Sequence, residues 1–272
     1  MHLELLARPR ELVNRAQYWK VRRLSALYRR RPGGRWRCPC CEFTGHFVPV
    51  AGRPNSVCPS CGSAERHRLQ HHVLTQLIAD RVTLGDVLHI APDSQLAPLL
   101  RSAASSYTTA DLDPHGVDIQ LDLTSTGLAS ESVDTVYASH VLEHIADDTA
   151  AIGEVHRILR PGGLAVLAVP VTQPSTVEFG RPIARDDYHF RNPGPDYFDR
   201  YRSVFEHVEV VTSDAAPPES QAYVYLDRSM PAGSKTADFV AVCHKALKPQ
   251  ARTEASASER TPAATIDDIA KR

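Results

Sequence analysis

The sequence predicts an α/β protein in which a small cysteine-rich module precedes a largely parallel sheet. From Asp86 onward, short β-rich runs alternate with helical stretches, as they do in βαβ units. Five of the six cysteines lie between Cys38 and Cys61, and this clustering favours a metal site over a disulfide framework. The 272 residues, 42% of them hydrophobic, suffice for one α/β domain and a smaller unit.

The elements of the sheet domain follow from the same alternation. Strands are expected at residues 86–91, 107–112, 117–121, 133–139 and 164–169, with a late antiparallel pair at 204–212 and 237–244. Helices are expected at 63–80, 93–103 and 149–159. Pro161, Gly162 and Gly163 should end the last of these helices in a turn.

Residues 1–35 are interpreted as a basic amphipathic helical arm, because apolar side chains recur every three or four positions with arginines on the other side. The first 37 residues carry a charge of +9 and the remainder −10. An acidic body argues against a polyanion lying across it, so nucleic-acid contact, if any, would come mainly from the arm. The alternatives for the arm are docking on the body or a partner, and peripheral contact with an anionic membrane through Trp19 and Tyr28.

Residues 36–66 are predicted to form a zinc-ribbon-like module. Cys38, Cys41, Cys58 and Cys61 make two Cys-x-x-Cys pairs separated by sixteen residues, a spacing typical of four-thiolate zinc sites. Cys40 offers an alternative to Cys41, although the two-residue spacing is the commoner one. Four thiolates leave no open position on the ion, so the zinc should be structural.

No membrane-spanning segment is expected, because the longest apolar run, around residues 164–171, is far shorter than the roughly 18 residues needed to cross a bilayer. The first twenty residues carry charges where a signal peptide would be apolar, so the default location is cytoplasmic. Residues 249–272 are rich in Ala, Ser, Thr and charge, and should form a disordered tail.

In open parallel sheets the ligand lies outside the carboxyl ends of the central strands. The turn after the first strand, His89 to Ser94, lacks the glycines that let backbone approach a nucleotide. Pro92 suits the first turn of the following helix, and Asp93 is suited to cap it or to accept from a ligand ammonium group.

Acidic residues follow the next two strands. Asp111 is the first candidate to bind ribose hydroxyls and Asp113 the second, while Asp122 is placed to meet an adenine amino group. The alternative for each acid is a helix cap or a solvated turn. The expected ligand contacts are His89, Ala91, Pro92, Asp93, Asp111, Leu112, Asp122, Leu123, Ser139 and His140.

Two motifs carry a family resemblance. Ser-Val-Asp-Thr-Val-Tyr-Ala-Ser-His-Val-Leu-Glu-His-Ile from Ser132 and His-Arg-Ile-Leu-Arg-Pro-Gly-Gly from His156 resemble the class I methyltransferase superfamily in its type 11 branch. The runs 58–68 and 88–93 are similar to a bacterial subgroup with zinc-ribbon cysteines. The resemblance covers residues 36–245 and implies a Rossmann-like seven-stranded sheet, a catalytic domain at 67–248, and S-adenosylmethionine as the methyl donor.

Methyl transfer to a hydroxyl needs an aligned nucleophile and a base that removes its proton. His189 is the first candidate base and His140 the second, and Arg191 would orient an anionic or hydroxylated acceptor. His140 could instead shape the cofactor pocket, and His144, also a candidate, could serve packing. The insert at residues 172–197 is the expected acceptor-binding lid.

Glu143 and His144 are also similar to the metal-binding Glu-His pair of some O-methyltransferases in the superfamily, although the companion acid is not evident.

The leading hypothesis is an enzyme that methylates a hydroxyl, less readily an amine, of a small molecule or glycan. One alternative is an RNA methyltransferase that grips RNA with the zinc module and the arm. Another is a non-catalytic zinc-ribbon binding module on a silent Rossmann domain.

Overall fold

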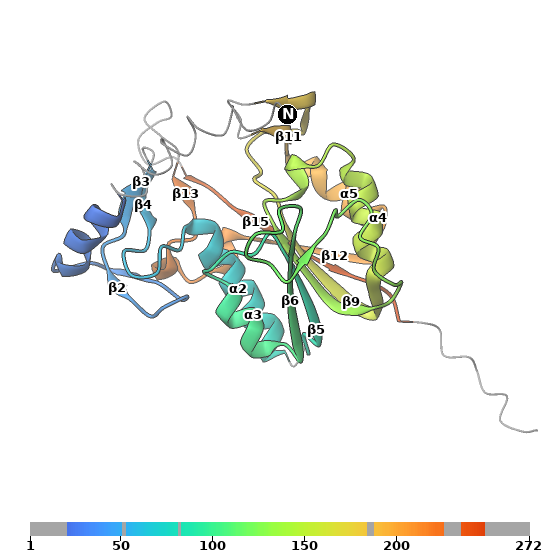
Figure 1. Cartoon of the computed structure of the whole chain (residues 1–272). Helices are drawn as coiled ribbons and strands as arrows, with labels where there is room; N and C mark the ends of the chain where they lie inside the picture. Colours follow the sequence, from blue (N-terminus) through green and yellow to red (C-terminus); the bar gives the residue numbers. More distant parts are fainter. Residues whose placement is uncertain (1–20, 51–52, 81–82, 184–187, 226–234, 248–272) are drawn as a thin grey trace, which may run out of the picture.

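The computed structural model describes residues 21–50, 53–80, 83–183, 188–225 and 235–247 (Figure 1). The first twenty residues of the predicted arm and the predicted tail at 249–272 lie outside this part. Residues 21–30, which end the predicted arm, are helical. No helix in the described ranges combines the length and apolar character needed to cross a membrane.

A seven-stranded sheet forms the centre of the molecule and confirms the predicted Rossmann-like architecture. Its strand order is β12-β15-β9-β8-β5-β6-β7. The strands are β5 (Asp86–Ile90), β6 (Ser106–Asp111), β7 (Ile119–Gln120), β8 (Val133–Ser139), β9 (Leu159–Ala168), β12 (His207–Thr212) and β15 (Phe239–His244). All neighbours are parallel except β15, which runs antiparallel to both β9 and β12. The chain order reverses between β5 and β8, where such sheets bind ligands.

Helices cover both faces of this sheet. They are α2 (Glu65–Ala79), α3 (Ala97–Ala103), α4 (Asp148–Ile158) and α5 (Phe198–Arg202), with short 3-10 turns η1 (Leu142–His144), η3 (Pro195–Tyr197), η4 (Ser213–Ala215) and η5 (Pro218–Ser220). One apolar cluster joins α2 and α3 to the sheet, and a second joins α4 and α5 to it from the other side (Figure 1). The result is the three-layer arrangement typical of α/β domains.

Three predicted boundaries need correction. The helix expected from residue 93 begins at Ala97, because the Asp93 carboxylate accepts the backbone N–H groups of Gln95 and Leu96 in a preceding turn. The strand expected at 117–121 is only two residues long. The predicted helix stop before Pro161 is confirmed, but the residues after it belong to β9, where a register shift relative to β8 absorbs them into the sheet.

The insert at 172–197 contains an antiparallel pair, β10 (Val177–Ile183) and β11 (His189–Asn192). Its inner end is fixed by Arg191, only 3% exposed, which contacts the Glu178 carboxylate from β11 to β10. A further short pair joins β13 (Val224–Tyr225) to β14 (Lys235–Thr236).

The cysteine-rich residues form two small hairpins beside α2 (Figure 1). Their strands are β1 (Trp36–Arg37), β2 (Thr44–Gly45), β3 (Val48–Val50) and β4 (Arg53–Val57). Arg68 of α2 is fully buried and donates to the carbonyl oxygens of Ser56, Ser63 and Gln221 at 2.7–3.0 Å. The guanidinium therefore joins the cysteine module, α2 and the segment after β12 at one point.

The fully buried His89 of β5 is expected to make the fold acid-sensitive. Its ring lies against Tyr107 and Tyr137, with Nδ1 2.7 Å from the Tyr107 hydroxyl, and burial lowers its pKa from 6.5 to about 4. Between these values the unfolded chain binds a proton that the native chain does not, so stability is full above pH 6.5 and falls toward pH 4. The slope should reach about 1.4 kcal/mol per pH unit for this one proton.

Urea midpoints measured across this window, for the wild type and for His89→Phe, test the expectation. The phenylalanine variant should have a shallower dependence on pH, whatever its stability at neutral pH. Equal slopes in the two proteins would show that His89 does not carry the effect.

Candidate active site and metal centre

The four predicted zinc ligands converge in the N-terminal module. The Sγ atoms of Cys38, Cys41, Cys58 and Cys61 all lie within 4.8 Å of one another, with Cys38 and Cys61 3.7 Å apart and Cys41 and Cys58 3.6 Å apart. Four sulfurs about 2.3 Å from a zinc ion at the centre of a tetrahedron would be about 3.8 Å apart, so the donor set fits the ion.

Each Cys-x-x-Cys pair lies on a tight turn that brings its two sulfurs to the same side. The N–H of Glu42 donates to the Cys38 carbonyl at 2.8 Å, and the N–H of Gly62 donates to the Cys58 carbonyl at 2.9 Å. Cys40 lies outside the group of four, and its sulfur is 3.9 Å from the carbonyl oxygen of His67. The geometry therefore favours the Cys38–Cys41 pairing over the alternative through Cys40.

Two strained residues stand at the edge of the sheet where the chain order reverses. Ala91 follows β5 with φ +47° and His140 follows β8 with φ +57°. Residues other than glycine rarely adopt these backbone angles. Their N–H groups donate to the carbonyls of Ala110 and Ala168, which hold both turns against the sheet. Such strain persists where the surrounding structure fixes it and is frequent at binding sites.

A cavity of about 250 Å³ opens at these strand ends. Asp111 ends β6 and Asp122 follows β7, so two carboxylates lie at one side of it, beside Leu112, which is 67% exposed. One oxygen of Asp122 already accepts the N–H and hydroxyl of Thr124, so this acid also caps a turn. The lining residues are Ile90, Ala91, Asp111, Leu112, Leu121, Asp122, Leu123, His140, Val141, His144 and Ile145.

Four of the expected ligand contacts do not line this cavity. His89 is enclosed in the sheet, because β5 is buried on both faces. Pro92 lies in the turn after β5, and the carboxylate of Asp93 is engaged in capping that turn. The hydroxyl of Ser139 is hydrogen-bonded to the side chain of Gln70 on α2. Asp113 also lies outside, bonded to the exposed His115.

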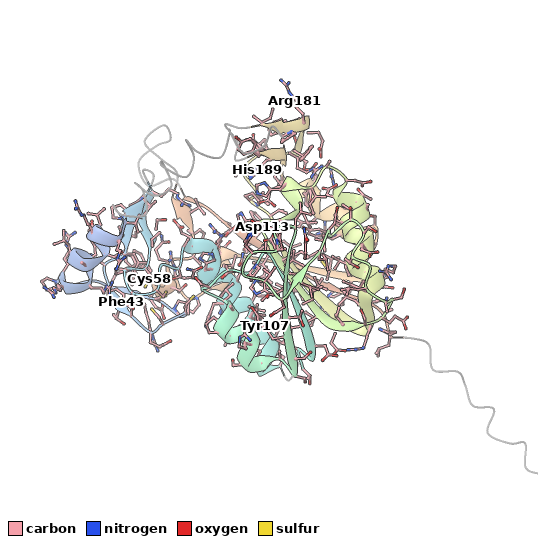
Figure 2. The ribbon with its side chains drawn as sticks, in the orientation of Figure 1. Phe43, Cys58, Tyr107, Asp113, Arg181 and His189 are labelled. Atoms are coloured by element: carbon pink, nitrogen blue, oxygen red, sulfur yellow. The ribbon has the colours of Figure 1, made fainter. Side chains whose placement is uncertain are left out.

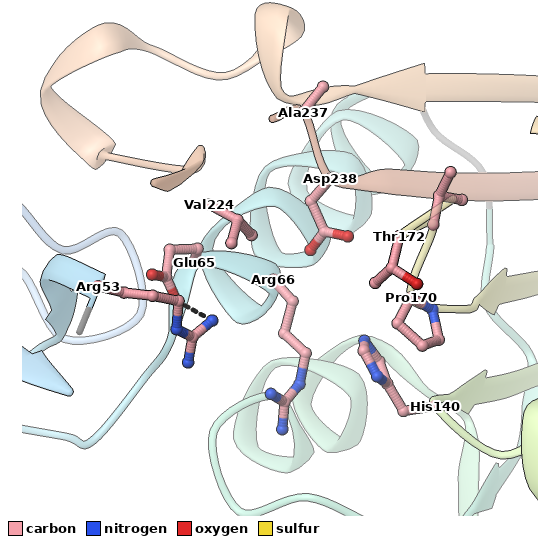
Figure 3. Close-up of a pocket in the computed structure, with 10 residues that line it drawn as sticks. Arg53, Glu65, Arg66, His140, Pro170, Thr172, Val224, Ala237 and Asp238 are labelled. Carbon is pink, nitrogen blue, oxygen red and sulfur yellow. Dashed lines mark ion pairs between the residues drawn. The ribbon is translucent and has the colours of Figure 1, made fainter. Parts of the chain in front are cut away.

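A second cavity, of about 230 Å³, shares His140 with the first (Figure 3). It lies between the cysteine module, the start of α2, the end of β9 and the start of β15. Its lining residues are Arg53, Glu65, Arg66, His140, Pro170, Val171, Thr172, Val224, Ala237 and Asp238. Sequence reasoning missed its charged residues. Glu65 and Arg66 belong to the run 58–68 that contributes to the family resemblance. The sequence does not indicate that this run lies beside residue 238 in the folded chain.

The half-buried His140, which lines both cavities, lies beside the fully buried Glu143. The His140 Nδ1 lies 3.5 Å from a Glu143 carboxyl oxygen, and the His140 Nε2 is buried without a hydrogen-bond partner among the described residues. Burial, and next the positive charge of Arg66, lower the pKa of His140 well below its usual value. Burial raises the pKa of Glu143 to about 8, so both groups are mainly neutral at pH 7.

The residues of the insert take other positions than expected. Arg191 donates to the carbonyl oxygens of Leu142, Ile145 and Ala146 at 2.6–2.9 Å, so it fixes the loop around η1 and is not directed at an acceptor. His189 lines neither cavity described above, and its ring lies 4.7 Å from that of His144. Figure 2 shows His189 above the sheet, far from Cys58.

His144 and His189 also share a cluster with Glu143. One ligand atom from each of the three lies within 4.8 Å of the others, and both carboxyl oxygens of Glu143 are buried without a hydrogen-bond partner in the described ranges. Two imidazoles and a carboxylate are a donor set that suits transition metals. The sequence offered no companion acid for Glu143 and His144, and the structure places His189 beside them as a third possible ligand.

Part of the chain is similar to known methyltransferases. Residues 74–167 match the family model of a methyltransferase domain. The chain is 28% identical over 139 residues to a probable S-adenosylmethionine-dependent methyltransferase of Mycobacterium tuberculosis, which covers 47% of this chain and 50% of the relative. It is 34% identical over 64 residues, 23% of this chain and 19% of the relative, to an uncharacterized 37.1 kDa protein in a transposon of Streptomyces fradiae.

The chain thus spans half or less of the length of these curated relatives. Among solved structures, N-methyltransferase NodS from Bradyrhizobium japonicum, in complex with S-adenosylhomocysteine, is 14% identical with a TM-score of 0.43, covering 66% of this chain and 87% of that one. The YcgJ protein from Bacillus subtilis is 14% identical with a TM-score of 0.41, covering 65% and 99%. The family match supports the assignment of this part of the chain to an enzyme domain of the methyltransferase class.

Proposed function

We propose that the protein transfers a methyl group from S-adenosylmethionine to a hydroxyl, less readily an amine, of a small molecule or glycan, and that its cysteine module holds a structural zinc ion. The observation that carries the proposal is the position of His140. This residue lines both cavities at the switch point of the sheet, so a donor in one and an acceptor in the other would meet beside it.

The first cavity suits the nucleoside end of the cofactor. Asp111 stands at the end of the second strand, where a carboxylate pairs with ribose hydroxyls, and Leu112 and Leu123 offer apolar surface to a base. Asp122 lies beyond them, near enough to accept from an amino group. When bound, S-adenosylmethionine supplies a methyl group activated on a sulfonium.

His140 is assigned the removal of the acceptor's proton. Its lowered pKa keeps the imidazole neutral, as a proton acceptor must be. With the Nδ1–H directed at Glu143, the Nε2 lone pair would take the proton from a hydroxyl. Arg191 is assigned a positioning role, since it fixes the loop that carries Glu143 and His144.

The two alternative functions make different predictions. An RNA methyltransferase should bind RNA in a steeply salt-dependent way that is lost without residues 1–37. A non-catalytic binding module should fail to bind S-adenosylhomocysteine. The small second cavity and the net negative charge of residues 38–272 favour the hypothesis of a small-molecule acceptor. Cytoplasmic location and membrane contact through the arm stay predictions.

Calorimetric titration of the zinc-loaded protein with S-adenosylhomocysteine tests the cofactor site. We expect about one site per chain, and a loss of affinity of about ten- to hundredfold in Asp111→Asn, because charged hydrogen bonds contribute about 1.5–3 kcal/mol. Asp113→Asn is the matched control, since this neighbouring acid lies outside the cavity. Unchanged affinity in Asp111→Asn, or an equal loss in both variants, would refute the assignment of Asp111.

A further inference from the structure

Charged groups of both signs meet in the second cavity, and one of them has no partner. Arg53 pairs with the buried Glu65, 3.5 Å away, whose carboxylate also accepts from the Ser56 hydroxyl. The half-buried Arg66 makes no hydrogen bond or ion pair with any residue in the described ranges. Figure 3 shows its side chain reaching into the space between Glu65 and His140.

Arg66 is exceptional in this chain. Every other buried or half-buried arginine in the described part forms an ion pair with a carboxylate or donates to backbone carbonyls. These arginines are Arg53, Arg68, Arg157, Arg160, Arg191 and Arg200. The charge of this half-buried guanidinium acts on Asp238 in the same cavity, but no carboxylate in the described part lies within ion-pair distance, so its hydrogen bonds stay open to a ligand anion. Its planar donor fork matches the two oxygens of a carboxylate or phosphate.

Asp238 supplies the opposite chemistry across the cavity. The residue is 8% exposed, and one carboxyl oxygen accepts the N–H of Phe239 at 3.0 Å. Burial raises its pKa to about 6, so it is mainly ionised at neutral pH and suited to accept a hydrogen bond from a hydroxyl or amine. The volume of about 230 Å³ is below the roughly 300–1,000 Å³ of ordinary ligand pockets, so the cavity holds a small molecule or one end of a larger one.

We propose that the second cavity binds an acceptor that carries a carboxylate or phosphate, with Arg66 as the residue that binds this anion and Asp238 as the acceptor of a hydrogen bond from a second polar group. The inference rests on the proposed function, because it takes this cavity as the acceptor site. It narrows the acceptor to molecules that carry an acidic group beside a hydroxyl or amino group. It also makes the cysteine module, through Arg53, part of the wall of the acceptor site.

The test compares two small probes of nearly equal size, trifluoropropionate and trifluoropropanol, by fluorine NMR titration of the zinc-loaded protein, with and without S-adenosylhomocysteine. We expect the carboxylate to bind about ten- to hundredfold more tightly than the alcohol. Arg66→Gln should abolish this preference, and inorganic phosphate should displace the carboxylate. Arg202→Gln, at an exposed arginine paired with Asp199 on α5, is the matched control and should keep the preference.

The affinity for S-adenosylhomocysteine separates the possible failures. If Arg66→Gln weakens S-adenosylhomocysteine and leaves the carboxylate probe unaffected, Arg66 serves the cofactor and the inference is overturned. Equal binding of the two probes, or a preference that survives in Arg66→Gln, overturns it as well. If the wild type binds the carboxylate through Arg66 but no S-adenosylhomocysteine, the anion site stands and the proposed methyltransferase function falls.

Discussion

Replacing Cys58 with serine is expected to unfold the N-terminal module and to lower zinc content well below one ion per chain. The four sulfurs already stand at the spacing of a tetrahedral zinc site, and Cys38 and Cys58 are fully buried. Binding of structural zinc in such sites is worth about 10–16 kcal/mol in small zinc-binding domains, so losing one thiolate removes a large part of the module's stability. Zinc is measured by mass spectrometry of the purified protein, and folding by thermal melting.

Cys40→Ser is the matched control for this experiment. Cys40 stands within two residues of Cys38 and belongs to the same cysteine run, but its sulfur lies outside the group of four. We expect this variant to keep one zinc per chain and a melting temperature near that of the wild type. Stoichiometric zinc in Cys58→Ser, or equal loss in the two variants, would contradict the assignment of the ligands.

The second large effect is expected at Arg68, whose guanidinium joins three parts of the chain. In Arg68→Met an apolar side chain replaces the guanidinium that lies over the Phe47 ring, and the buried carbonyls of Ser56, Ser63 and Gln221 lose their donor. A buried polar group left without its hydrogen-bond partner costs about 1–3 kcal/mol, so the loss at three carbonyls is expected to be at least about 3 kcal/mol. We expect the free energy of unfolding in urea to fall by this amount.

Arg202→Met provides the comparison, because Arg202 is exposed and makes one ion pair with Asp199 in the same helix. Exposed pairs of this kind contribute about 0.3–0.5 kcal/mol. A loss in Arg68→Met no larger than in Arg202→Met would mean that the cysteine module is not fastened to the sheet domain through this residue. A separate early transition in Arg68→Met would show that the module then unfolds alone.

Much of the fold could be predicted because its signals are local. The alternation of apolar runs with helical stretches predicts the strands, and the observed β5 and β8 agree with the expected residues to within one position. Local signals misplaced a boundary where a strand is irregular. Pro161, Gly162 and Gly163 were predicted as a turn, and they lie within β9 at a register shift that leaves them without partners in β8 or β15.

The candidate site was also predicted in part. Ala91, Asp111, Leu112, Asp122, Leu123, His140 and His144 follow strands or the turns after them, and strand order alone predicted that they would meet at one edge of the sheet. The same reasoning from strand order wrongly predicted His89 as a ligand contact, because this residue is buried within β5 and does not line the cavity.

The sequence by itself indicated the methyltransferase class, the four cysteines whose sulfurs lie together, and the edge of the sheet where the first cavity opens. Each of these depends on residues a fixed number of positions apart in one motif or on the alternation of strands and helices. Only the tertiary structure decided the acceptor cavity, because its walls come from the module, α2, β9 and β15, which lie together only after folding. Arg66 and Asp238, 172 positions apart, can serve one ligand because the sheet brings the start of α2 beside the start of β15.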